Sequence, residues 1–293
     1  MFNRLYIATQ NVMIGHLPKP ILQIVIRIYH FSITIKWLLA DMINSLLGRR
    51  DELMPPKRLL YGIGEGDFKH VGESFLQYFK ELCGLRPDEK VLDVGCGVGR
   101  MAIPLTKYLD ERGGYEGFDI SGERIKWCQK KITPKYPNFR FQLADIQNKA
   151  YNPKGKFSSS EYIFPYDDES FDFVFLTSVF THMMLQDMEN YFAQVARVLK
   201  TGGRCLITFF LLNAESIELI DANISHLDFR YNFGRYRSVD EVTPESAIAY
   251  PEDFIFSLYE KHGFIVVKPI LYGSWCGRER FFDYQDIIIG HLK

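Results

Sequence analysis

The chain has 293 residues, a length that fits one large domain or two small ones. Hydrophobic residues make up 47% of the chain and charged residues 24%, which is the composition of a globular protein with a sizeable buried core. The net charge of −1 gives no global positive field to attract nucleic acid, so we expect no nucleic-acid partner.

The cysteines and the first residues indicate a reducing compartment. The five cysteines have no C-x-x-C spacing, so neither a disulfide framework nor a zinc site is predicted, and no metal is expected. The start of the chain lacks the short charged region, apolar core and cleavage site of a secretory signal peptide. We therefore expect a cytoplasmic protein.

Residues 1–60 are predicted to form a helical arm in front of the main domain. Polar residues recur with a helical period between residues 20 and 48, and the rest of that helix is apolar. Three charged residues, Arg27, Lys36 and Asp41, interrupt the uncharged run that a bilayer span requires. Three roles remain open for the arm: a lid or a contact with a second copy of the chain, a peripheral membrane helix, or a true span.

A glycine-rich turn follows an apolar strand predicted at residues 90–94. The chain continues there as Gly-Cys-Gly-Val-Gly, residues 95–99. Because glycine lacks a Cβ atom, this backbone can turn sharply and approach a ligand closely. A second apolar strand, at residues 115–119, ends on Asp119, whose carboxylate can accept two hydrogen bonds from a ribose diol. The pattern predicts a nucleotide-binding turn.

Apolar strands alternate with amphipathic helices from residue 90 to residue 210, which predicts a parallel sheet built from βαβ units. Further strands are expected at residues 139–143, 171–176 and 204–210, and helices at residues 99–110, 122–133 and 187–199. The last two strands, near residues 264–271 and 285–291, are joined by too few residues for a crossover helix and must pair antiparallel. Residues 211–263 are predicted to be an insertion with helical stretches that lies over the ligand crevice.

These motifs resemble those of the class I S-adenosylmethionine-dependent methyltransferases. Val-Leu-Asp-Val-Gly-Cys-Gly-Val-Gly-Arg, residues 91–100, is similar to the family's first motif, and Gly-Phe-Asp-Ile-Ser, residues 117–121, to its second. Three more matches follow in the family's order: Leu-Ala-Asp-Ile at 143–146, Ser-Phe-Asp-Phe-Val-Phe at 170–175 and Arg-Val-Leu-Lys-Thr-Gly-Gly-Arg at 197–204. Five motifs in order are far more specific than one glycine turn.

The resemblance implies an α/β domain at residues 61–293, with a Rossmann-like seven-stranded sheet and an antiparallel terminal hairpin. The alternative is a dinucleotide-binding dehydrogenase, which shares the strand, the glycine turn and the acidic residue. That fold needs a glycine three positions after Gly97, where this chain has Arg100. The methyltransferase interpretation is therefore favoured.

The resemblance also implies which residues bind S-adenosylmethionine and its product S-adenosylhomocysteine. The implied residues are Asp93, Gly95, Gly97 and Gly99 around the methionine moiety, Asp119 at the ribose with Ile120 beside it, and Asp145 with Ile146 at the adenine. Each also has a structural interpretation, because glycine is common in turns and aspartate is common at turns and helix caps.

The loop after the fourth strand, Leu-Thr-Ser-Val-Phe-Thr-His-Met at residues 176–183, faces both cofactor and acceptor in the family. His182 is the candidate general base for a hydroxyl acceptor, because an imidazole has a pKa near neutrality. The alternative is that His182 caps the next helix or packs beneath the cofactor. The loop lacks the Asn/Asp-Pro-Pro-Tyr/Phe motif with which similar enzymes methylate amino groups of nucleic acids, and no carboxylate cluster for magnesium follows it.

Aromatic residues near the end of the chain are candidates for the substrate site, since an apolar or ring-bearing acceptor requires such contacts. The candidates are Tyr250, Trp275, Arg278 and Tyr284, and each has a core-packing alternative. The expected function is methylation of a small molecule at a hydroxyl oxygen. An amine or carbon methyltransferase and a catalytically inactive, cofactor-binding regulatory protein remain the alternatives.

Overall fold

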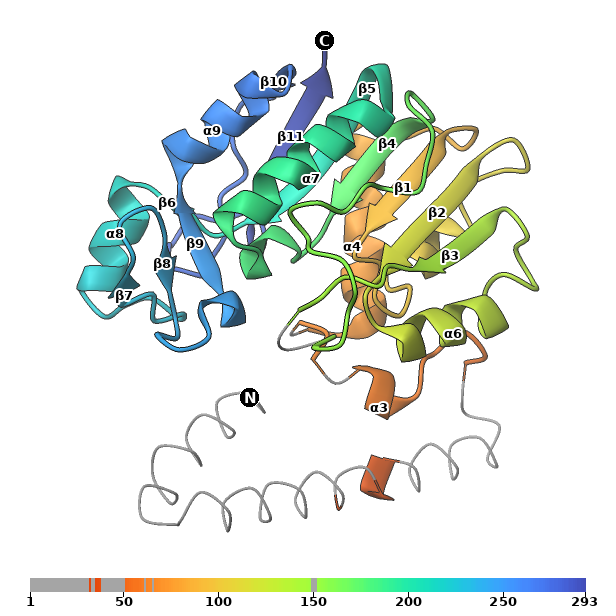
Figure 1. Cartoon of the computed structure of the whole chain (residues 1–293), viewed down its shortest axis with the longest axis horizontal. Helices are drawn as coiled ribbons and strands as arrows, with labels where there is room; N and C mark the ends of the chain where they lie inside the picture. Colours follow the sequence, from red (N-terminus) through yellow and green to blue (C-terminus); the bar gives the residue numbers. More distant parts are fainter. Residues whose placement is uncertain (1–31, 33–34, 38–50, 61, 65, 149–151) are drawn as a thin grey trace. The chain divides into compact units, whose positions relative to one another are not determined.

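The computed structural model describes residues 32, 35–37, 51–60, 62–64, 66–148 and 152–293 (Figure 1). The chain divides into two compact units, residues 1–62 and residues 63–293. The first unit contains the short helix α3, Lys57–Leu60. Most of the predicted arm, and with it the choice between lid, dimer contact and membrane helix, lies outside the described residues. Within the described ranges, no helix has the length and apolarity needed to span a membrane.

The second unit is built on a seven-stranded sheet with the order β10-β11-β5-β4-β1-β2-β3 (Figure 1). Its strands are β1 Lys90–Val94, β2 Gly114–Asp119, β3 Phe139–Leu143, β4 Phe171–Leu176, β5 Leu199–Phe209, β10 Phe264–Val266 and β11 Asp286–Leu292. Strands β1 to β5 are parallel, and β11 runs antiparallel to both β5 and β10. The predicted Rossmann-like sheet with its terminal antiparallel hairpin is confirmed.

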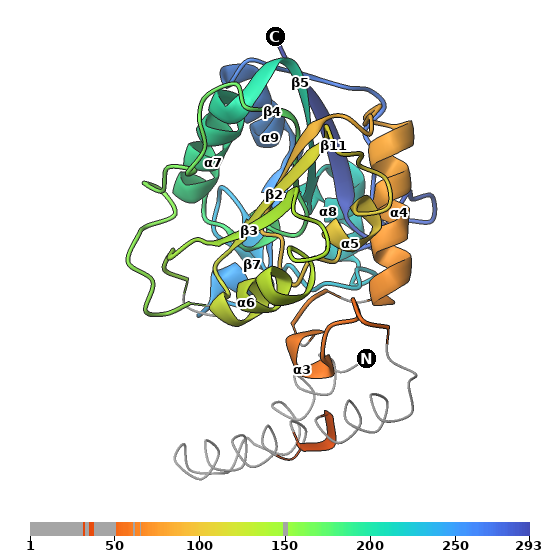
Figure 2. The same ribbon diagram turned by 90° about the vertical axis from the view of Figure 1, so that its right-hand side faces the viewer.

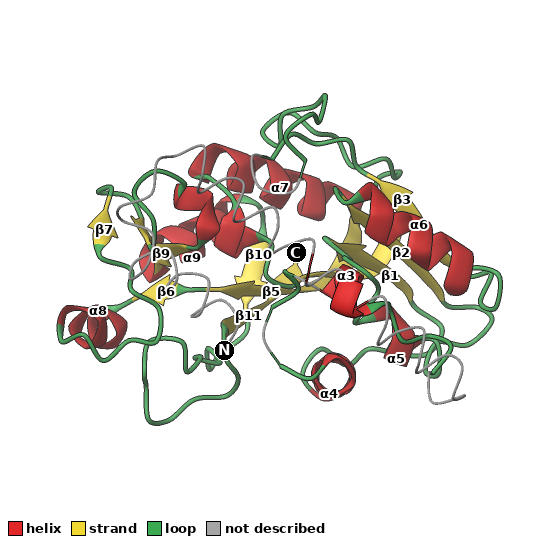
Figure 3. Cartoon of the chain, turned by 90° about the horizontal axis from the view of Figure 1, so that it is seen from below, coloured by secondary structure: helices red, strands yellow, loops and turns green. Residues whose placement is uncertain are grey.

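Helices cover both faces of this sheet. Helix α4 lies on one face, and α7 and α9 lie on the other (Figures 2 and 3). The helices of this unit are α4 Phe68–Glu81, α5 Ala102–Leu105, α6 Gly122–Lys131, α7 Leu185–Val198, α8 Ala214–Asp221 and α9 Glu252–Lys261. In α7 the buried residues Met188, Tyr191, Phe192 and Val195 recur at the spacing of one helix face, which is why this helix packs flat on the sheet.

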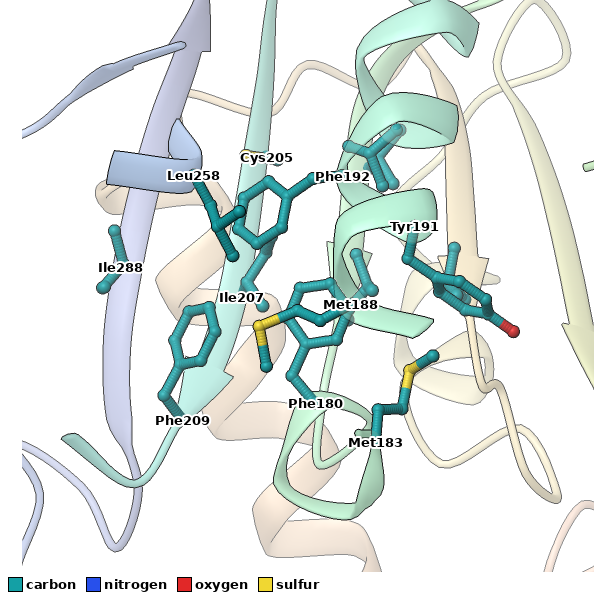
Figure 4. Packing of buried hydrophobic residues seen from close by; sticks show 14 of the residues in the cluster. Phe180, Met183, Met188, Tyr191, Phe192, Cys205, Ile207, Phe209, Leu258 and Ile288 are labelled. Carbon is teal, nitrogen blue, oxygen red and sulfur yellow. The ribbon is translucent and has the colours of Figure 1, made fainter. Parts of the chain in front are cut away.

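The core under α7 and α9 is made of large side chains from four elements (Figure 4). Ile207 of β5, Phe192 of α7, Leu258 of α9 and Ile288 of β11 are each at most 3% exposed. Burying a side chain of this size stabilises the fold by about 1.5–3 kcal/mol. This core holds the carboxyl ends of the parallel strands at one edge, where ligands bind in sheets of this type.

Two predicted elements are shorter in the structure. The helix predicted at residues 99–110 is only α5, because the Thr106 hydroxyl donates to the Ile103 carbonyl 2.6 Å away and the chain leaves the helix there. The strand predicted at residues 264–271 ends at Val266, and Pro269 has no N–H group with which to continue the ladder.

The insertion at residues 211–263 has the expected helical stretches and, in addition, a small sheet that the sequence did not predict. Beside α8 and α9 it contains a small sheet with the strand order β6-β9-β8-β7. These strands are β6 Leu211–Leu212, β7 Tyr231–Asn232, β8 Arg237–Ser238 and β9 Ile248–Pro251. Three of them have two residues each, too few for an alternating pattern to show in the sequence.

The buried carboxylate of Asp286 joins the two sheets. Asp286 begins β11, and its Oδ2 accepts hydrogen bonds from the Leu211 amide of β6 and from Trp275 Nε1, both at 2.7 Å. Its Oδ1 accepts from the Gly273 amide at 2.7 Å, and Arg278 Nη1 lies 3.4 Å from that oxygen. Burial raises the pKa of Asp286 to about 6, so the group is ionised at neutral pH and accepts all of these bonds.

We predict that Asp286→Ala destabilises the protein by at least about 3 kcal/mol, because buried donors and a buried arginine charge lose their acceptor. Urea unfolding at neutral pH measures this change. The matched control is Asp228→Ala, which removes an exposed carboxylate that pairs with Arg230 and should cost less than about 1 kcal/mol. Equal losses in the two variants would show that Asp286 does not hold the sheets together.

Candidate functional site

The glycine turn after β1 exposes bare backbone at one position. Gly95, Gly97 and Gly99 have φ angles of +83°, +54° and +76°, a region that side chains disfavour. A Cβ atom on Gly95 would lie 2.5 Å from Val179 Cγ2, and one on Gly99 would lie 2.9 Å from Ile132 Cδ1. A Cβ atom on Gly97 would meet no atom within 4 Å. Gly95 and Gly99 therefore permit close packing, whereas Gly97 faces open space that a ligand can enter.

The Asp119 carboxylate lies against this turn at the carboxyl end of β2. Its Oδ2 accepts from the Gly97 amide at 2.9 Å, and its Oδ1 accepts from the Ser121 amide at 2.8 Å. Burial raises the pKa of Asp119, while the Ser121 and Gly97 amides oppose that rise. Since a carboxylate oxygen can accept two hydrogen bonds, each oxygen keeps capacity for a further donor such as a hydroxyl.

Asp93, predicted to surround the methionine moiety, is sealed from solvent in the structure. The residue is 1% exposed, and its Oδ2 accepts from the Tyr115 hydroxyl at 2.6 Å. Among the described residues, nothing forms a hydrogen bond with its Oδ1. Burial raises the pKa of Asp93 to about 8, the Tyr115 hydrogen bond lowers it, and the charge of Asp119 raises it further. In this conformation Asp93 has no surface with which to touch a ligand.

The residues predicted near the adenine differ in their exposure. Asp145 is partly exposed beyond the end of β3. Its Oδ1 lies 3.4 Å from Asn152 Nδ2, and its Oδ2 lies 3.8 Å from Lys156 Nζ. Ile146 is 1% exposed and belongs to the hydrophobic core, so its side chain is not available to an adenine ring in this conformation. Ile120 is partly buried and packs against the same core. Of the three, Asp145 offers the accessible polar group.

The candidate base His182 ends the short 3-10 helix η1, Phe180–His182, just after β4. Phe180 anchors η1 by stacking on Phe192 at 5.2 Å between ring centroids (Figure 4). The His182 Nδ1 lies 2.9 Å from the carbonyl oxygen of Glu245, in a second 3-10 helix, η2 Pro244–Ser246. A carbonyl only accepts, so Nδ1 of the neutral ring carries the proton. The backbone of Ser246 also forms a hydrogen bond with the ring. Burial lowers the pKa of His182.

The remaining substrate-site candidates contribute to packing. Tyr250 is 1% exposed and donates its hydroxyl to the Met183 carbonyl, while Trp275 is fully buried against Phe210 and Phe229. Arg278 pairs with Glu215 and Asp286. Tyr284 is 39% exposed. That any of these side chains also contacts a substrate stays a prediction.

Sequence reasoning missed a polar pair at the same sheet edge. Ser178, two residues past β4, has a φ of 58°, and its amide donates to the Thr208 hydroxyl at 2.8 Å. Its own hydroxyl lies 3.1 Å from Gln285 Oε1, just before β11. Its neighbour Val179 fills the space beside Gly95. Backbone strain of this kind is concentrated at ligand sites, but nothing in a serine's identity predicts a positive φ.

No metal centre was found among the residues that the structure describes. There, no three side chains of His, Cys, Asp or Glu gather in an arrangement that could hold an ion.

The known proteins to which this chain is similar are methyltransferases. A family described as "Methyltransferase domain" matches residues 85–247, more than half of the chain. The chain is 28% identical over 145 residues to phosphoethanolamine N-methyltransferase 3 of Arabidopsis thaliana, a match that covers 50% of this chain and 26% of that protein. It is 27% identical over 141 residues to a sterol 24-C-methyltransferase of Schizosaccharomyces pombe, covering 46% of this chain and 33% of that protein. The matched segment thus spans only about a quarter to a third of these relatives' length.

Among solved structures, the fold is similar to magnesium protoporphyrin IX methyltransferase from Synechocystis PCC 6803, crystallised with S-adenosylhomocysteine. The TM-score is 0.50 at 18% identity, over 81% of this chain and 92% of that one. The matched family, the strand order and the glycine turn agree, and this chain belongs to the class I S-adenosylmethionine-dependent methyltransferases.

Proposed function

We propose that this chain transfers a methyl group from S-adenosylmethionine to a hydroxyl oxygen of a small-molecule acceptor. The observation that carries the cofactor part is the Asp119 carboxylate, fixed by the Gly97 and Ser121 amides beside the open face of Gly97. This carboxylate can accept from a ribose diol, and the missing Cβ at Gly97 gives the rest of the cofactor room to approach the backbone. When bound, the cofactor supplies a methyl group on a positively charged sulfonium.

The chain's residues then bind and orient the reactants. Asp119 would accept the ribose hydroxyls, and Asp145 would accept from the adenine amino group. Backbone at residues 95–99 would line the methionine moiety. Methyl transfer is an in-line displacement, so holding donor and acceptor in line accounts for much of the rate enhancement.

His182 would take the proton from the acceptor hydroxyl. The backbone of Glu245 and Ser246 holds its ring in place. Because burial holds the pKa of His182 below its usual value, the imidazole is neutral at physiological pH and ready to accept a proton. The lowered pKa suits a general base.

The curated relatives favour a second candidate, methylation of nitrogen or carbon. Phosphoethanolamine N-methyltransferase and sterol 24-C-methyltransferase each match about half of this chain. An amine acceptor must also lose a proton before attack, so His182 could serve either chemistry. The release of S-adenosylhomocysteine with separate panels of hydroxyl, amine and carbon acceptors distinguishes these candidates. Cofactor binding without release on any panel would favour the regulatory alternative.

We predict that Asp119→Ala weakens S-adenosylmethionine binding about tenfold to a hundredfold, because a carboxylate that accepts from the ribose contributes about 1.5–3 kcal/mol. Isothermal titration calorimetry measures the dissociation constant. The control is Asp253→Ala, which removes an exposed carboxylate from the first turn of α9 and should leave the affinity unchanged. A folded Asp119→Ala variant with wild-type affinity would remove Asp119 from the site.

We predict that His182→Ala slows turnover by about 10² to 10⁴ and leaves the affinity for S-adenosylmethionine nearly unchanged, as expected for loss of a general base. In the wild type, activity should rise with pH through the His182 pKa, with its acid limb below about pH 6.5. His291→Ala, at an exposed histidine of β11, is the control. Full turnover without His182, or loss of cofactor binding alone, would return the residue to a structural role.

A further inference from the structure

A buried carboxyl group lies at the end of β1, two residues before the glycine turn. Asp93 accepts from the Tyr115 hydroxyl through Oδ2, and no hydrogen-bond partner for Oδ1 exists among the described residues. A buried polar atom without a partner is costly, and proteins retain one mainly where it has a task. Asp93 therefore needs an explanation beyond packing.

Tyr115 is held rigidly against this carboxyl group. Its ring is fully buried and stacks on Phe139, with 5.1 Å between centroids and 14° between planes. Gly117 makes room for it, since a Cβ atom there would lie 2.9 Å from the Tyr115 ring and from Cys96 Cβ. The Tyr115 hydroxyl thus holds the carboxyl group of Asp93 two residues before the glycine turn.

Among the described residues, the titratable groups that interact with Asp93 supply no positive charge. The titratable groups that interact with it are Tyr115 and Asp119 of β2, Cys96 of the turn, Cys128 of α6 and Tyr166 of the loop before β4. Each of these groups is neutral or negative at physiological pH. Burial raises the pKa of Asp93 to about 8, so without a nearby cation the carboxyl group keeps its proton.

We propose that Asp93 distinguishes the cofactor from its product by charge: the carboxyl group loses its proton to a greater extent when the sulfonium occupies the glycine turn than when the neutral thioether does. The O–H bond of the carboxyl breaks on cofactor binding and the proton passes to the solvent; the reverse occurs after transfer. This inference rests on the proposed function. It makes Asp93 a specificity-determining residue that acts through the field across the turn, without direct contact.

The low polarity around Asp93 makes this coupling effective. Charges interact several times more strongly in a protein interior than in water, so a cation near the turn favours the carboxylate although no atom of the cofactor touches it. S-adenosylhomocysteine has the same adenosine and amino-acid groups but no sulfonium. The comparison of the two ligands therefore cancels the titration of the shared α-amino group, of pKa about 7.7–8.0, and the contacts with Asp119.

Calorimetric titration of the full chain with each ligand tests the proposal. Titrations run from about pH 6.5 to 8.5, in phosphate and in Tris, whose ionisation enthalpies differ, and give the number of protons released on binding. We expect S-adenosylmethionine to release more protons than S-adenosylhomocysteine. The ratio of product to cofactor dissociation constants should rise with pH, by up to about tenfold per pH unit below the Asp93 pKa. Equal proton release and a constant ratio would overturn the inference.

Substitutions test whether the proton released on cofactor binding comes from Asp93. Asp93→Asn cannot ionise, so its ratio of dissociation constants should not depend on pH. Tyr115→Phe keeps the ring but removes the donor that lowers the Asp93 pKa, so the rise of the ratio should move to higher pH. Tyr136→Phe, at another ring that contacts Phe139, is the control and should behave as wild type. Because Tyr115→Phe keeps its packing, it tests the proposal even if Asp93→Asn does not fold.

The outcomes separate this inference from the proposed function. If both ligands bind with parallel pH dependence, or if Tyr115→Phe leaves the ratio unchanged at every pH, the inference fails and cofactor binding stands. If neither ligand binds, the proposed function fails and this inference fails with it.

Discussion

The site depends on the hydrogen bonds that join the ends of β1 and β2. The two strands are parallel with Val94 beside Phe118, so their carboxyl ends meet at one edge of the sheet. The Gly95 and Cys96 amides donate to the Phe118 carbonyl at 2.9 and 3.0 Å, and the Gly97 amide donates to Asp119. These bonds fix the turn and the carboxylate relative to each other. The open face of Gly97 therefore lies beside the Asp119 carboxylate.

The loop that carries the candidate base His182 is held in place by contacts with residues that are distant in sequence. The His182 ring is held by a carbonyl 63 residues away, and the Tyr250 hydroxyl donates to the Met183 carbonyl 67 residues away. Both partners belong to the insertion, which Asp286 in turn ties to the main sheet through the Leu211 amide. Changes in the insertion can thus alter the candidate base without touching the cofactor-binding turn.

The difference between local contacts and contacts distant in sequence explains which features could be predicted from the sequence. The glycine turn, the place of Asp119 and the positions of the parallel strands were predictable because each depends on a local pattern: closely spaced glycines, an acid at a strand end and apolar runs. The Glu245 contact of His182 and the strain at Ser178 have no local signal. Trp275 and Arg278 were reasonable candidates by residue type, but their role around Asp286 follows from pairing between distant strands. Residue type alone could not separate a buried cluster from a substrate contact.

Three aspartates of the main domain show how environment sets the role of one residue type. Asp286 accepts from three N–H groups and lies beside Arg278, which limits the rise of its pKa to about 6, so its charge persists at neutral pH and holds two sheets together. Asp119 accepts from the two amides that aim it at the turn. Asp93 accepts from a single hydroxyl, and burial raises its pKa to about 8. The number of donors therefore decides which of these groups is a fixed charge and which can exchange a proton near neutral pH.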